Sequence, residues 1–459
     1  MFRKVLIANR GEIACRVART CRALGVASVA VYSDADEKAP HVALADEALL
    51  LGPPPVRDSY LNQAALLAAL ARSGADAVHP GYGFFSENAD FARAVRAAGV
   101  TFIGPSPDAI ERLGDKIGAR AMARSAGVQP PPGSAAAIDP KNVGELEQLA
   151  AGVGYPVIVK AAAGGGGIGM LVAKDASELA RAATSASERA RQAFGDDRIY
   201  LERYLDRPRH VEVQILADAR GNVVALGERE CSVQRRHQKI IEETPCALFD
   251  AASERRSALE AHAVDIVRAA DYEGAGTVEF IVDSSGNAFF LEVNARIQVE
   301  HPVTEMVTGL DLVEAQLRIA SGEPLSDAVR SATRKGAAIE ARLYAEDPER
   351  GFIPQPGRIE RLRFPDAAPD LRIESGVVEG YEITSHYDPL IAKIVAWGPD
   401  RAAAVARLGA ALAATEVRVV GPKSDRATNL PLLRRLLQNP EFAAGDYDTG
   451  LVERAGKTP

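Results

Sequence analysis

The sequence predicts a mixed α/β protein, α+β overall, with about three domains, and three observations support this prediction. Strands and helices alternate over residues 1 to about 114, a glycine run follows Lys160, and strands separated by turns begin at Arg198. Alternation of the first kind is typical of a parallel sheet flanked by helices. A chain of 459 residues is also too long for one ordinary core.

The first region, residues 1–114, gives the clearest pattern. Val5–Ala8 is a short apolar strand, and apolar residues at helical spacing follow it from Ile13 to Leu24. The segments that continue this alternation are Ser28–Tyr32, Leu61–Ala71, Asp76–His79, Phe91–Ala98 and Thr101–Gly104. No Gly-x-Gly-x-x-Gly follows the first strand, so a dinucleotide-binding domain has little support.

A second region begins at the proline-rich connector Gln129–Ser134. It contains helix, strand, glycine loop, strand and long helix, with the regular elements at Asn142–Ala151, Tyr155–Lys160, Met170–Lys174 and Ser177–Phe194. We expect this part, about residues 133–204, to move as one small lobe. Later elements are a helix at Ala251–Asp271 and, in a tail from about Lys335, strands at Ala337–Tyr344 and Ile391–Trp397.

Charge and composition argue against several classes of protein. The 54 basic and 62 acidic residues give a net charge of −8, which suits nucleic-acid phosphates poorly. No run approaches about 18 apolar residues, so we expect no membrane span. The N-terminus opens into a strand rather than a secretion signal. The four cysteines lack metal or redox spacing, so we expect them to be buried in a cytoplasmic protein.

The strongest local signal is the glycine run after Lys160, where five of the six residues 164–169 are glycine. Backbone N–H groups in such a loop can close on phosphate oxygens, because no side chains block the approach. Lys160 would add a point charge to the same phosphates. A flexible turn is the alternative, but so many glycines cost much chain entropy, and we therefore favour phosphate binding.

Two predicted strands of a hairpin carry one glutamate each, Glu279 and Glu292. If Asp283 pairs with Ala288 at the turn, the two glutamates lie directly opposite each other. Opposed like charges destabilise a ladder unless a divalent cation lies between them. Asn294 would share the face of Glu292, and these oxygen ligands suit Mg²⁺ or Mn²⁺. The alternative is a pair of solvent-facing glutamates on an edge hairpin.

Two polar clusters lie on either side of the glutamate hairpin in the sequence. In Ala295–Pro302, Arg296 offers a forked donor set for a planar anion, and Glu300 is a candidate general base. The segment Glu230–Lys239 is similarly polar and cationic, although on composition alone it is equally compatible with a solvated surface strand.

Together these residues resemble the biotin carboxylase family of the ATP-grasp superfamily. The matching segments are Ile7–Ala14, His79–Phe84, Gly114–Lys116, the loop after Lys160, Arg209–Glu212, Gln234–Lys239 and Arg296–Glu305. The resemblance implies an N-terminal parallel α/β domain at 1–114, an ATP-grasp domain at 115–334 whose lid is the lobe at about 133–204, and a mixed α/β C-terminal domain at 335–459.

The resemblance implies ATP as substrate and Mg²⁺ or Mn²⁺ as cofactor. The residues implied at ATP, with Arg203 and Leu205 acting through the main chain, are Lys116, Lys160, Gly165, Gly166, Gly167, Glu202, Arg203, Leu205, His210, Gln234 and His237. The metal ligands would be Glu279, Glu292 and Asn294. On sequence alone, Lys116 could merely serve the helix it begins, and His210 could be a packing histidine.

For the carboxylation chemistry, the resemblance implies bicarbonate at Lys239, Arg296, Gln298, Glu300 and the backbone of Val299, and biotin at Tyr82 and Arg342. Glu300 would deprotonate bicarbonate, Arg342 would stabilise the biotin enolate, and Lys239 and Arg296 would assist catalysis. Carboxyphosphate would be the intermediate. The implied partners are a biotin carboxyl carrier protein, the carboxyltransferase of an acyl-CoA carboxylase or similar enzyme, as in fatty acid biosynthesis, and a second copy of the chain.

Two alternatives remain open. An ATP-grasp ligase joining a carboxylate to an amine would share the lysines and the glutamate pair, but it has no use for the Arg296–Glu300 cluster with Arg342. A non-catalytic nucleotide-binding subunit would not need Glu300 and Lys239. The sequence contains no Ala-Met-Lys-Met, so we expect the biotin to be attached to another protein.

The chain departs from the family pattern at four places. Ala163 and Ile168 stand where glycine and a basic residue are common, and Ala295 replaces a usual threonine. Ser424–Ala427 looks like an insertion. The changes near the glycine loop would alter lid closure, and the insertion would alter the surface toward biotin or a partner.

Overall fold

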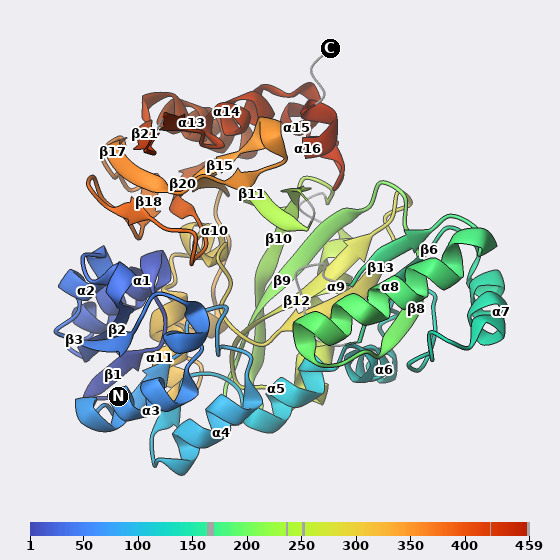
Figure 1. Ribbon diagram of the computed structural model, residues 1–459, viewed down its shortest axis with the longest axis horizontal. Coiled ribbons are helices and arrows are strands. Elements are labelled where there is room, and N and C mark those ends of the chain that lie inside the picture. The colour runs from blue at the N-terminus through green and yellow to red at the C-terminus, as the bar shows by residue number, and fades with distance from the viewer. Residues whose placement is uncertain (163–168, 236, 250–252, 423, 457–459) are drawn as a thin grey trace.

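The computed structural model describes residues 1–162, 169–235, 237–249, 253–422 and 424–456. Figure 1 shows the N-terminal part in blue, a green lobe on the right and the orange-red tail at the top, with a large sheet between them. Among the described residues, no helix combines the length and apolar character that crossing a membrane requires.

The N-terminal part is a five-stranded sheet with every neighbouring pair parallel, as predicted. Its strand order is β3-β2-β1-β4-β5, and the strands are β1 (Lys4–Ile7), β2 (Ala27–Ser33), β3 (Glu47–Gly52), β4 (Ala77–His79) and β5 (Thr101–Phe102). The edge strand β3 was not predicted, because its side chains are half-exposed and give no clear alternation. The four cysteines are free and buried, as expected.

Helices cover both faces of this sheet. They are α1 (Gly11–Ala23), α2 (Pro40–Leu44), α3 (Gln63–Ser73), α4 (Ala89–Ala97) and α5 (Pro107–Gly114). Ile13 and Val17 of α1 pack with Ile7 of β1 and with the later helix α11 (Leu312–Ala320). Residues of α3 and α4 pack on the opposite face. The N-terminal part is thereby joined to the centre of the chain through a shared core.

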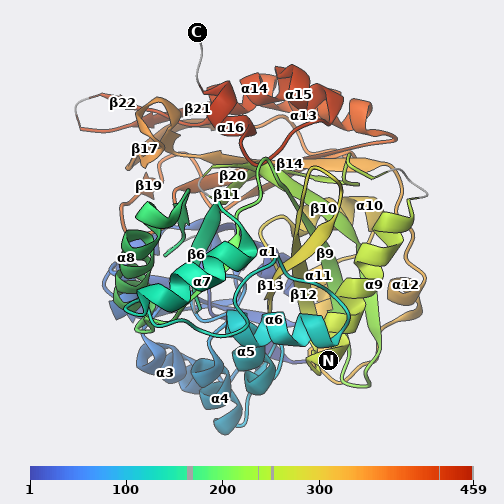
Figure 2. The ribbon, with the colours of Figure 1, turned by 90° about the vertical axis from the view of Figure 1, so that its right-hand side faces the viewer.

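The predicted small lobe is a three-stranded antiparallel sheet with its own apolar core. It contains α7 (Val143–Val153), β6 (Val157–Ala161), β7 (Leu171–Ala173), α8 (Ala176–Phe194) and β8 (Ile199–Arg203), with strand order β7-β6-β8. All buried members of its core lie between Ile138 and Leu201, and Figure 2 shows α7 and α8 beside β6. A separate core is the property that a lobe needs to move as one body.

An eight-stranded antiparallel sheet forms the centre of the molecule, in the order β13-β12-β9-β10-β11-β14-β20-β18. Its strands are β9 (Arg209–Ala217), β10 (Val223–Arg235), β11 (Gln238–Thr244), β12 (Gly274–Val282), β13 (Ala288–Asn294), β14 (Ala337–Tyr344), β18 (Leu371–Ser375) and β20 (Leu390–Gly398). The sheet runs without interruption from the central region into the tail, because β11 pairs with β14. Helices α6 (Lys116–Ser125), α9 (Glu254–Ala269), α10 (His301–Thr308) and α12 (Asp327–Arg330) flank it.

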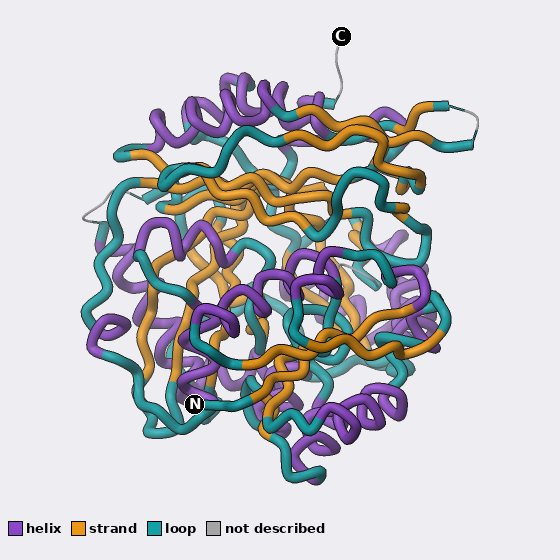
Figure 3. Tube along the Cα trace, turned by 90° about the vertical axis from the view of Figure 1, so that its left-hand side faces the viewer, coloured by secondary structure: helices purple, strands orange, loops and turns teal. Residues whose placement is uncertain are grey.

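The tail adds a layer of helices over its strands, visible at the top of Figure 3. These helices are α13 (Arg401–Ala414), α14 (Leu430–Gln438), α15 (Pro440–Ala444) and α16 (Leu451–Ala455). Two small sheets complete it: β15 (Glu346–Asp347) with β16 (Ile353–Pro354), and β17 (Gly357–Arg363) with β19 (Glu382–Ile383), β21 (Glu416–Val420) and β22 (Asp425–Arg426). The unusual segment at Ser424–Ala427 thus supplies β22, which pairs with β21.

His79 ends β4 and is fully buried as a neutral imidazole. Its Nδ1 accepts a hydrogen bond of 3.0 Å from the Gly81 N–H, so Nε2 carries the proton and faces Gln316 at 3.3 Å. Burial lowers the pKa of His79 to about 4 from the model-peptide value of 6.5. Protonation would place an uncompensated charge in the core and break the bond from Gly81.

We expect the free energy of unfolding to fall as pH falls from about 6.5 to about 4. In this range His79 is protonated in the unfolded chain but stays neutral in the folded protein. The loss of unfolding free energy that comes from His79 is about 3 kcal/mol. His79→Gln should remove that part of the loss between pH 7 and pH 4, measured by urea unfolding. His386→Gln, at an exposed position, should leave the pH dependence as in the wild type.

Candidate active site

Glu279 and Glu292 stand directly opposite each other on β12 and β13, as predicted. The pairing predicted at the turn is wrong by one residue. Val282 rather than Asp283 pairs with Ala288, since the Asp283 carboxylate accepts hydrogen bonds from backbone N–H groups of the turn. A β-bulge beside Glu279 then shifts the register and restores the opposition of the two glutamates.

Each of these carboxylates is paired with a cation from another element. Lys116, the first residue of α6, places its ammonium group on Glu292. Lys239 of β11 donates to Glu279 at 2.9 Å. Asn294 Oδ1 accepts from Arg296 at 2.8 Å. The hairpin therefore offers three oxygen donors on one face, and a divalent cation there would replace the cationic side chains that now neutralise them.

Glu279 is ionised at neutral pH, as a metal ligand must be. Burial alone would raise its pKa, but the positive charges of Lys239 and His210 outweigh burial and hold it well below its usual range. Within the described ranges, His210, Glu212 and Glu279 also bring ligand atoms within 4.8 Å of one another. Both oxygens of Glu212 already hold buried cations, Arg229 at 2.6 Å and Lys239 at 2.5 Å. The hairpin differs from this group in having a second carboxylate, Glu292, directly opposite Glu279, and an amide oxygen on the same face.

Lys239 is the centre of the site. Its ammonium group lies 2.5 Å from Glu212, 2.9 Å from Glu279 and 2.6 Å from Glu300. Burial alone would lower the pKa of Lys239, but the surrounding carboxylates raise it well above its usual range. Lys239 therefore keeps its positive charge and connects the glutamate hairpin to Glu300.

Glu300 lies immediately before α10 and is held between two cations. Its two oxygens accept from Lys239 at 2.6 Å and from Arg342 of β14 at 2.9 Å. Burial alone would raise the pKa of Glu300, but Lys239, Arg342 and Arg229 outweigh it and hold the pKa well below its usual range. The group is therefore fully ionised at neutral pH and can accept a proton without first losing one.

The side chains around Arg296 come from both ends of the sequence. Arg296 donates to Glu87, in the loop before α4, at 3.0 Å, and Glu87 also accepts from the Ala295 N–H at 2.9 Å. Gln298 donates to Glu279 at 2.9 Å. The Val299 carbonyl accepts from Lys393 of β20 at 2.8 Å. The predicted bicarbonate residues are thus gathered, and Glu87 and Lys393 are contacts that sequence reasoning missed.

Arg229 of β10 was also missed, although it donates hydrogen bonds to several side chains that hold the site residues in place. Its side chain is fully buried, and its five acceptors are Glu212, Gln214, Thr277, Gln298 and Thr304, at 2.6 to 3.1 Å. It fixes Gln298 directly, and it fixes Lys239 through Glu212. The sequence gives no local signal for this role, because Arg229 lies between two glutamates and precedes the polar segment Glu230–Lys239.

Each of the two predicted nucleotide lysines is paired with a carboxylate, Lys116 with Glu292 and Lys160 with Glu202. Lys160 of β6 lies 2.5 Å from Glu202 of β8, and Arg120 of α6 contacts the same carboxylate. The Arg203 N–H donates to Pro132 at 2.7 Å, and its guanidinium donates to Val153, so this side chain serves the lobe. The predicted loop residues Gly165, Gly166 and Gly167, with Ala163 and Ile168, lie outside the described residues. Leu205 is half-buried just beyond β8.

His210 lies between the glutamate hairpin and the nucleotide residues. It donates from Nε2 to Glu279 at 3.0 Å, and Nδ1 accepts from Gln234 at 3.3 Å. Burial alone would lower the pKa of His210, but Glu279 outweighs it and raises the pKa. His237 adopts a φ of 70°, and burial together with Lys160 lowers the pKa of its imidazole. The segment Glu230–Gln234 is buried in β10, so it is not a solvated surface strand.

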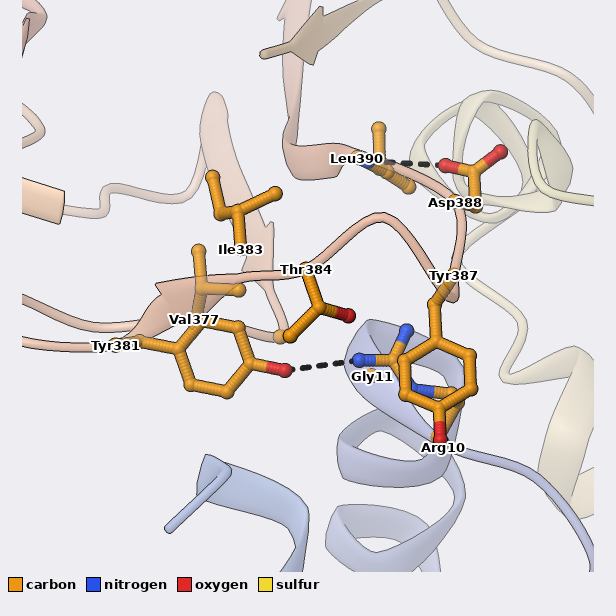
Figure 4. A pocket seen from close by; sticks show the side chains of 10 residues that line it. Arg10, Gly11, Val377, Tyr381, Ile383, Thr384, Tyr387, Asp388 and Leu390 are labelled. Atoms are coloured by element: carbon orange, nitrogen blue, oxygen red, sulfur yellow. Dashed lines mark hydrogen bonds between the residues drawn. The ribbon is translucent and has the colours of Figure 1, made fainter. Parts of the chain in front are cut away.

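Tyr82 is connected to the tail rather than directly to Arg342. Its hydroxyl donates to Glu12 of α1, and Glu12 lies 3.1 Å from Lys393. A cavity of about 20 Å³ lies nearby, where Arg10 meets Tyr381 and Tyr387 of the tail (Figure 4). It has room for about one water molecule and is too small for a substrate.

The arrangement combines a lobe with its own core, two opposed carboxylates that suit a divalent cation, a group of cations and the ionised carboxylate of Glu300. Lys239 contacts both Glu279 of the hairpin and Glu300, and Arg296 contacts Asn294 of the hairpin, so these two cations offer positive charge to a small anion beside the opposed glutamates. Arg342, whose pKa is raised above its usual range because Glu242 and Glu300 outweigh burial, supplies a fixed positive charge on the far side of Glu300. Such a site can activate a small oxyanion for phosphoryl transfer.

Three family models match the chain, and together they span most of it. Residues 1–110 match "Biotin carboxylase, N-terminal domain", residues 115–328 match "Carbamoyl-phosphate synthase L chain, ATP binding domain", and residues 340–454 match "Biotin carboxylase C-terminal domain". A biotin carboxylase of Halalkalibacterium halodurans is 48% identical over 98% of this chain and 97% of that protein.

Two further comparisons agree with these. The propionyl-CoA carboxylase alpha chain of Ruegeria pomeroyi is 47% identical over 98% of this chain and 68% of that protein. The crystal structure of the biotin carboxylase domain dimer of 2-oxoglutarate carboxylase from Hydrogenobacter thermophilus, in complex with MgADP, ADP and bicarbonate, is similar with a TM-score of 0.94. It is 43% identical and covers 100% of this chain and 99% of that one.

Proposed function

This chain belongs to the biotin carboxylase family, and from that premise we infer that it carboxylates biotin with ATP and bicarbonate. The observation that carries the inference is Glu300, an ionised carboxylate held between Lys239 and Arg342. An amine ligase or a nucleotide-binding subunit has no need of a base in this setting. The fold, the family and the site therefore agree on one activity.

We propose specific roles for the nucleotide and metal residues. Lys116 and Lys160 contact the ATP phosphates, and Glu202, His210, Gln234 and His237 lie along the nucleotide. Glu279, Glu292 and Asn294 hold Mg²⁺ or Mn²⁺, which would neutralise phosphate charge when bound. Support comes from the opposed carboxylates and from the lysines that now pair with them.

The first chemical step that we propose uses Glu300 as the base. Bicarbonate binds to Lys239, Arg296, Gln298 and the backbone of Val299, and its charge weakens the hold of Lys239 on Glu300. Glu300 then accepts the bicarbonate proton while a bicarbonate oxygen attacks the γ-phosphorus, giving carboxyphosphate and ADP.

The second step transfers the carboxyl group. Carboxyphosphate breaks down to CO₂ and phosphate, phosphate takes the N1 proton of biotin, and the biotin enolate attacks CO₂. Arg342 stabilises the enolate oxygen through its fixed charge, and Tyr82 lines the biotin side. Closure of the lobe at about 133–204 would exclude water from the unstable intermediate.

The domain division and the partners are also proposals. We place the domains at residues 1–114, 115–334 and 335–459, although the continuous sheet joins the last two. We propose biotin on a carrier protein as the acceptor, a carboxyltransferase as the next enzyme, and a homodimer as the working form. The dimer of the Hydrogenobacter thermophilus domain supports the last point.

The direct test is ATP cleavage by the purified protein with Mg²⁺, in the presence and absence of bicarbonate and free biotin. We expect phosphate release that requires bicarbonate and rises with biotin. If bicarbonate and biotin change nothing, and an acid with an amine accelerates cleavage instead, the amine-ligase alternative is correct. Nucleotide binding without cleavage would indicate a non-catalytic subunit.

A further inference from the structure

Two buried carboxyl groups lie close to Arg342, and the proposed mechanism does not use them. Glu242 of β11 and Glu340 of β14 are direct cross-strand partners in the eight-stranded sheet. The accessible surface of each residue is 0% of its full value. Two ionised carboxylates in this arrangement would repel each other without any screening by water.

Apolar side chains cover the pair on the side of helix α10. Helix α10 packs on the face of the sheet that carries Glu340, and Val303 and Val307 of that helix contact Ala338 and Val395. Among the described residues, no oxygen of Glu340 or Glu242 has a hydrogen-bond partner, although Glu242 forms an ion pair with Arg342. A buried charge without partners is among the most costly features of a folded protein. Glu340 is therefore neutral in this setting, and a neutral carboxyl group can hydrogen-bond to Glu242.

Three cations lie close to the pair. Arg342 of β14 lies 2.5 Å from Glu242 and 2.9 Å from Glu300. Lys393 of β20 faces Glu340, but its ammonium group is bound to Glu12 and to the Val299 carbonyl. Lys239, three positions before Glu242 on β11, is engaged by Glu212, Glu279 and Glu300. Arg342 is therefore the cation that Glu242 and Glu300 share.

We propose that Glu242 and Glu340 share one proton and act as positioning residues, holding Arg342 between Glu242 and Glu300. This inference rests on the proposed function of Arg342 toward biotin. With one shared proton, the three carboxyl groups around Arg342 carry two negative charges. Loss of that proton adds a third, which competes with the developing negative charge on biotin for the same guanidinium group.

The titration behaviour of the two groups supports the geometry. Burial raises the pKa of Glu340 well above its usual range, and burial raises the pKa of Glu242 to about 7. The shared proton is thus present at and below neutral pH and is lost as pH rises. We expect the biotin-dependent rate to fall in that alkaline range, while bicarbonate-dependent cleavage without biotin falls less.

The proton can be observed without any activity assay. A protonated carboxyl group has an infrared C=O stretching band that an ionised carboxylate lacks. We expect a component of this band in the wild-type protein at neutral pH that disappears on raising the pH and is absent from Glu340→Gln. Glu305→Gln is the matched control, because Arg16 and Arg372 outweigh burial and lower the pKa of buried Glu305, which is therefore ionised.

The positioning role is tested by the pH profile of the biotin-dependent rate. An ionisation that controls a rate changes it by about tenfold per pH unit beyond the pKa. The alkaline limb should move or disappear in Glu340→Gln, which keeps this position neutral. Glu242→Gln should lower the biotin-dependent rate by about tenfold, because Arg342 loses one of the two buried carboxylates that pair with it.

The outcomes separate this inference from the proposed function. If the wild-type protein lacks the infrared band at neutral pH, the shared proton does not exist, whatever the enzyme does. If the band is present but the alkaline limb is unchanged in Glu340→Gln, the positioning role is wrong. If the protein does not respond to biotin at all, the proposed function fails, and the positioning role fails with it, although the band still reports the proton.

Discussion

Glu300→Gln is expected to lower bicarbonate-dependent ATP cleavage by about 10²- to 10⁴-fold, the usual contribution of a general base. The amide keeps the size of the side chain and can remain between Lys239 and Arg342, but it cannot take the bicarbonate proton. The effect should appear in kcat, since the groups proposed to bind ATP lie on other elements. Steady-state phosphate release with saturating ATP and Mg²⁺ measures it.

Glu305→Gln is a matched control on the neighbouring helix α10. Its carboxylate is as deeply buried as that of Glu300, but it pairs with Arg16 at 2.8 Å and Arg372 at 2.6 Å, outside the site. This variant should lose stability rather than the response to bicarbonate. A Glu300→Gln protein that is folded, binds ATP as the wild type does and still cleaves ATP at the wild-type rate would exclude Glu300 as the base.

The hairpin shows which features of the site can be predicted from the sequence and which cannot. The opposition of Glu279 and Glu292 was predicted correctly, but from a turn pairing that is one residue out of register. The pairing at the turn was wrong, because Asp283 uses its carboxylate to close the turn and leaves the ladder. The bulge that compensates adds one residue to β13, and no residue type in that strand marks its position.

Contacts between distant segments could not be predicted in the same way. Arg296 meets Glu87, which is 209 positions away, and Lys393 reaches Val299 and Glu12 from the tail. Local patterns describe periodicity along one element, whereas these contacts depend on how whole domains pack. Arg229 is the strongest case, because its five partners come from several elements and none follows from its own neighbours.

The same limit applies to the fold. The parallel N-terminal sheet followed from strands that alternate with helices, since this order permits few other arrangements. The joining of β11 to β14 did not follow, because strand patterns do not specify which antiparallel edge receives a later strand. That pairing places Arg342 beside Glu242 and Glu300, so the position of this arginine depends on a contact that the sequence does not reveal.

Arg342→Ala is expected to remove the stimulation of phosphate release by biotin and to lower biotin carboxylation by about 10²- to 10³-fold, as loss of an oxyanion donor does. Two effects contribute. The enolate loses its fixed positive charge, and Glu300 and Glu242 lose the cation they share. The second effect also threatens folding, since an unpaired buried carboxylate costs about 3–5 kcal/mol. Rates with and without biotin, together with urea unfolding, separate the two.

A double variant separates the effect of Arg342 on biotin from its effect on stability. Glu242→Gln combined with Arg342→Ala removes the buried negative charge that the single change leaves unpaired, so stability should recover while the biotin response stays absent. Arg342→Lys keeps a positive charge but loses the planar fork that spans Glu242 and Glu300, so a partial response is expected. If the double variant regains the biotin response along with its stability, Arg342 serves the fold and not the enolate.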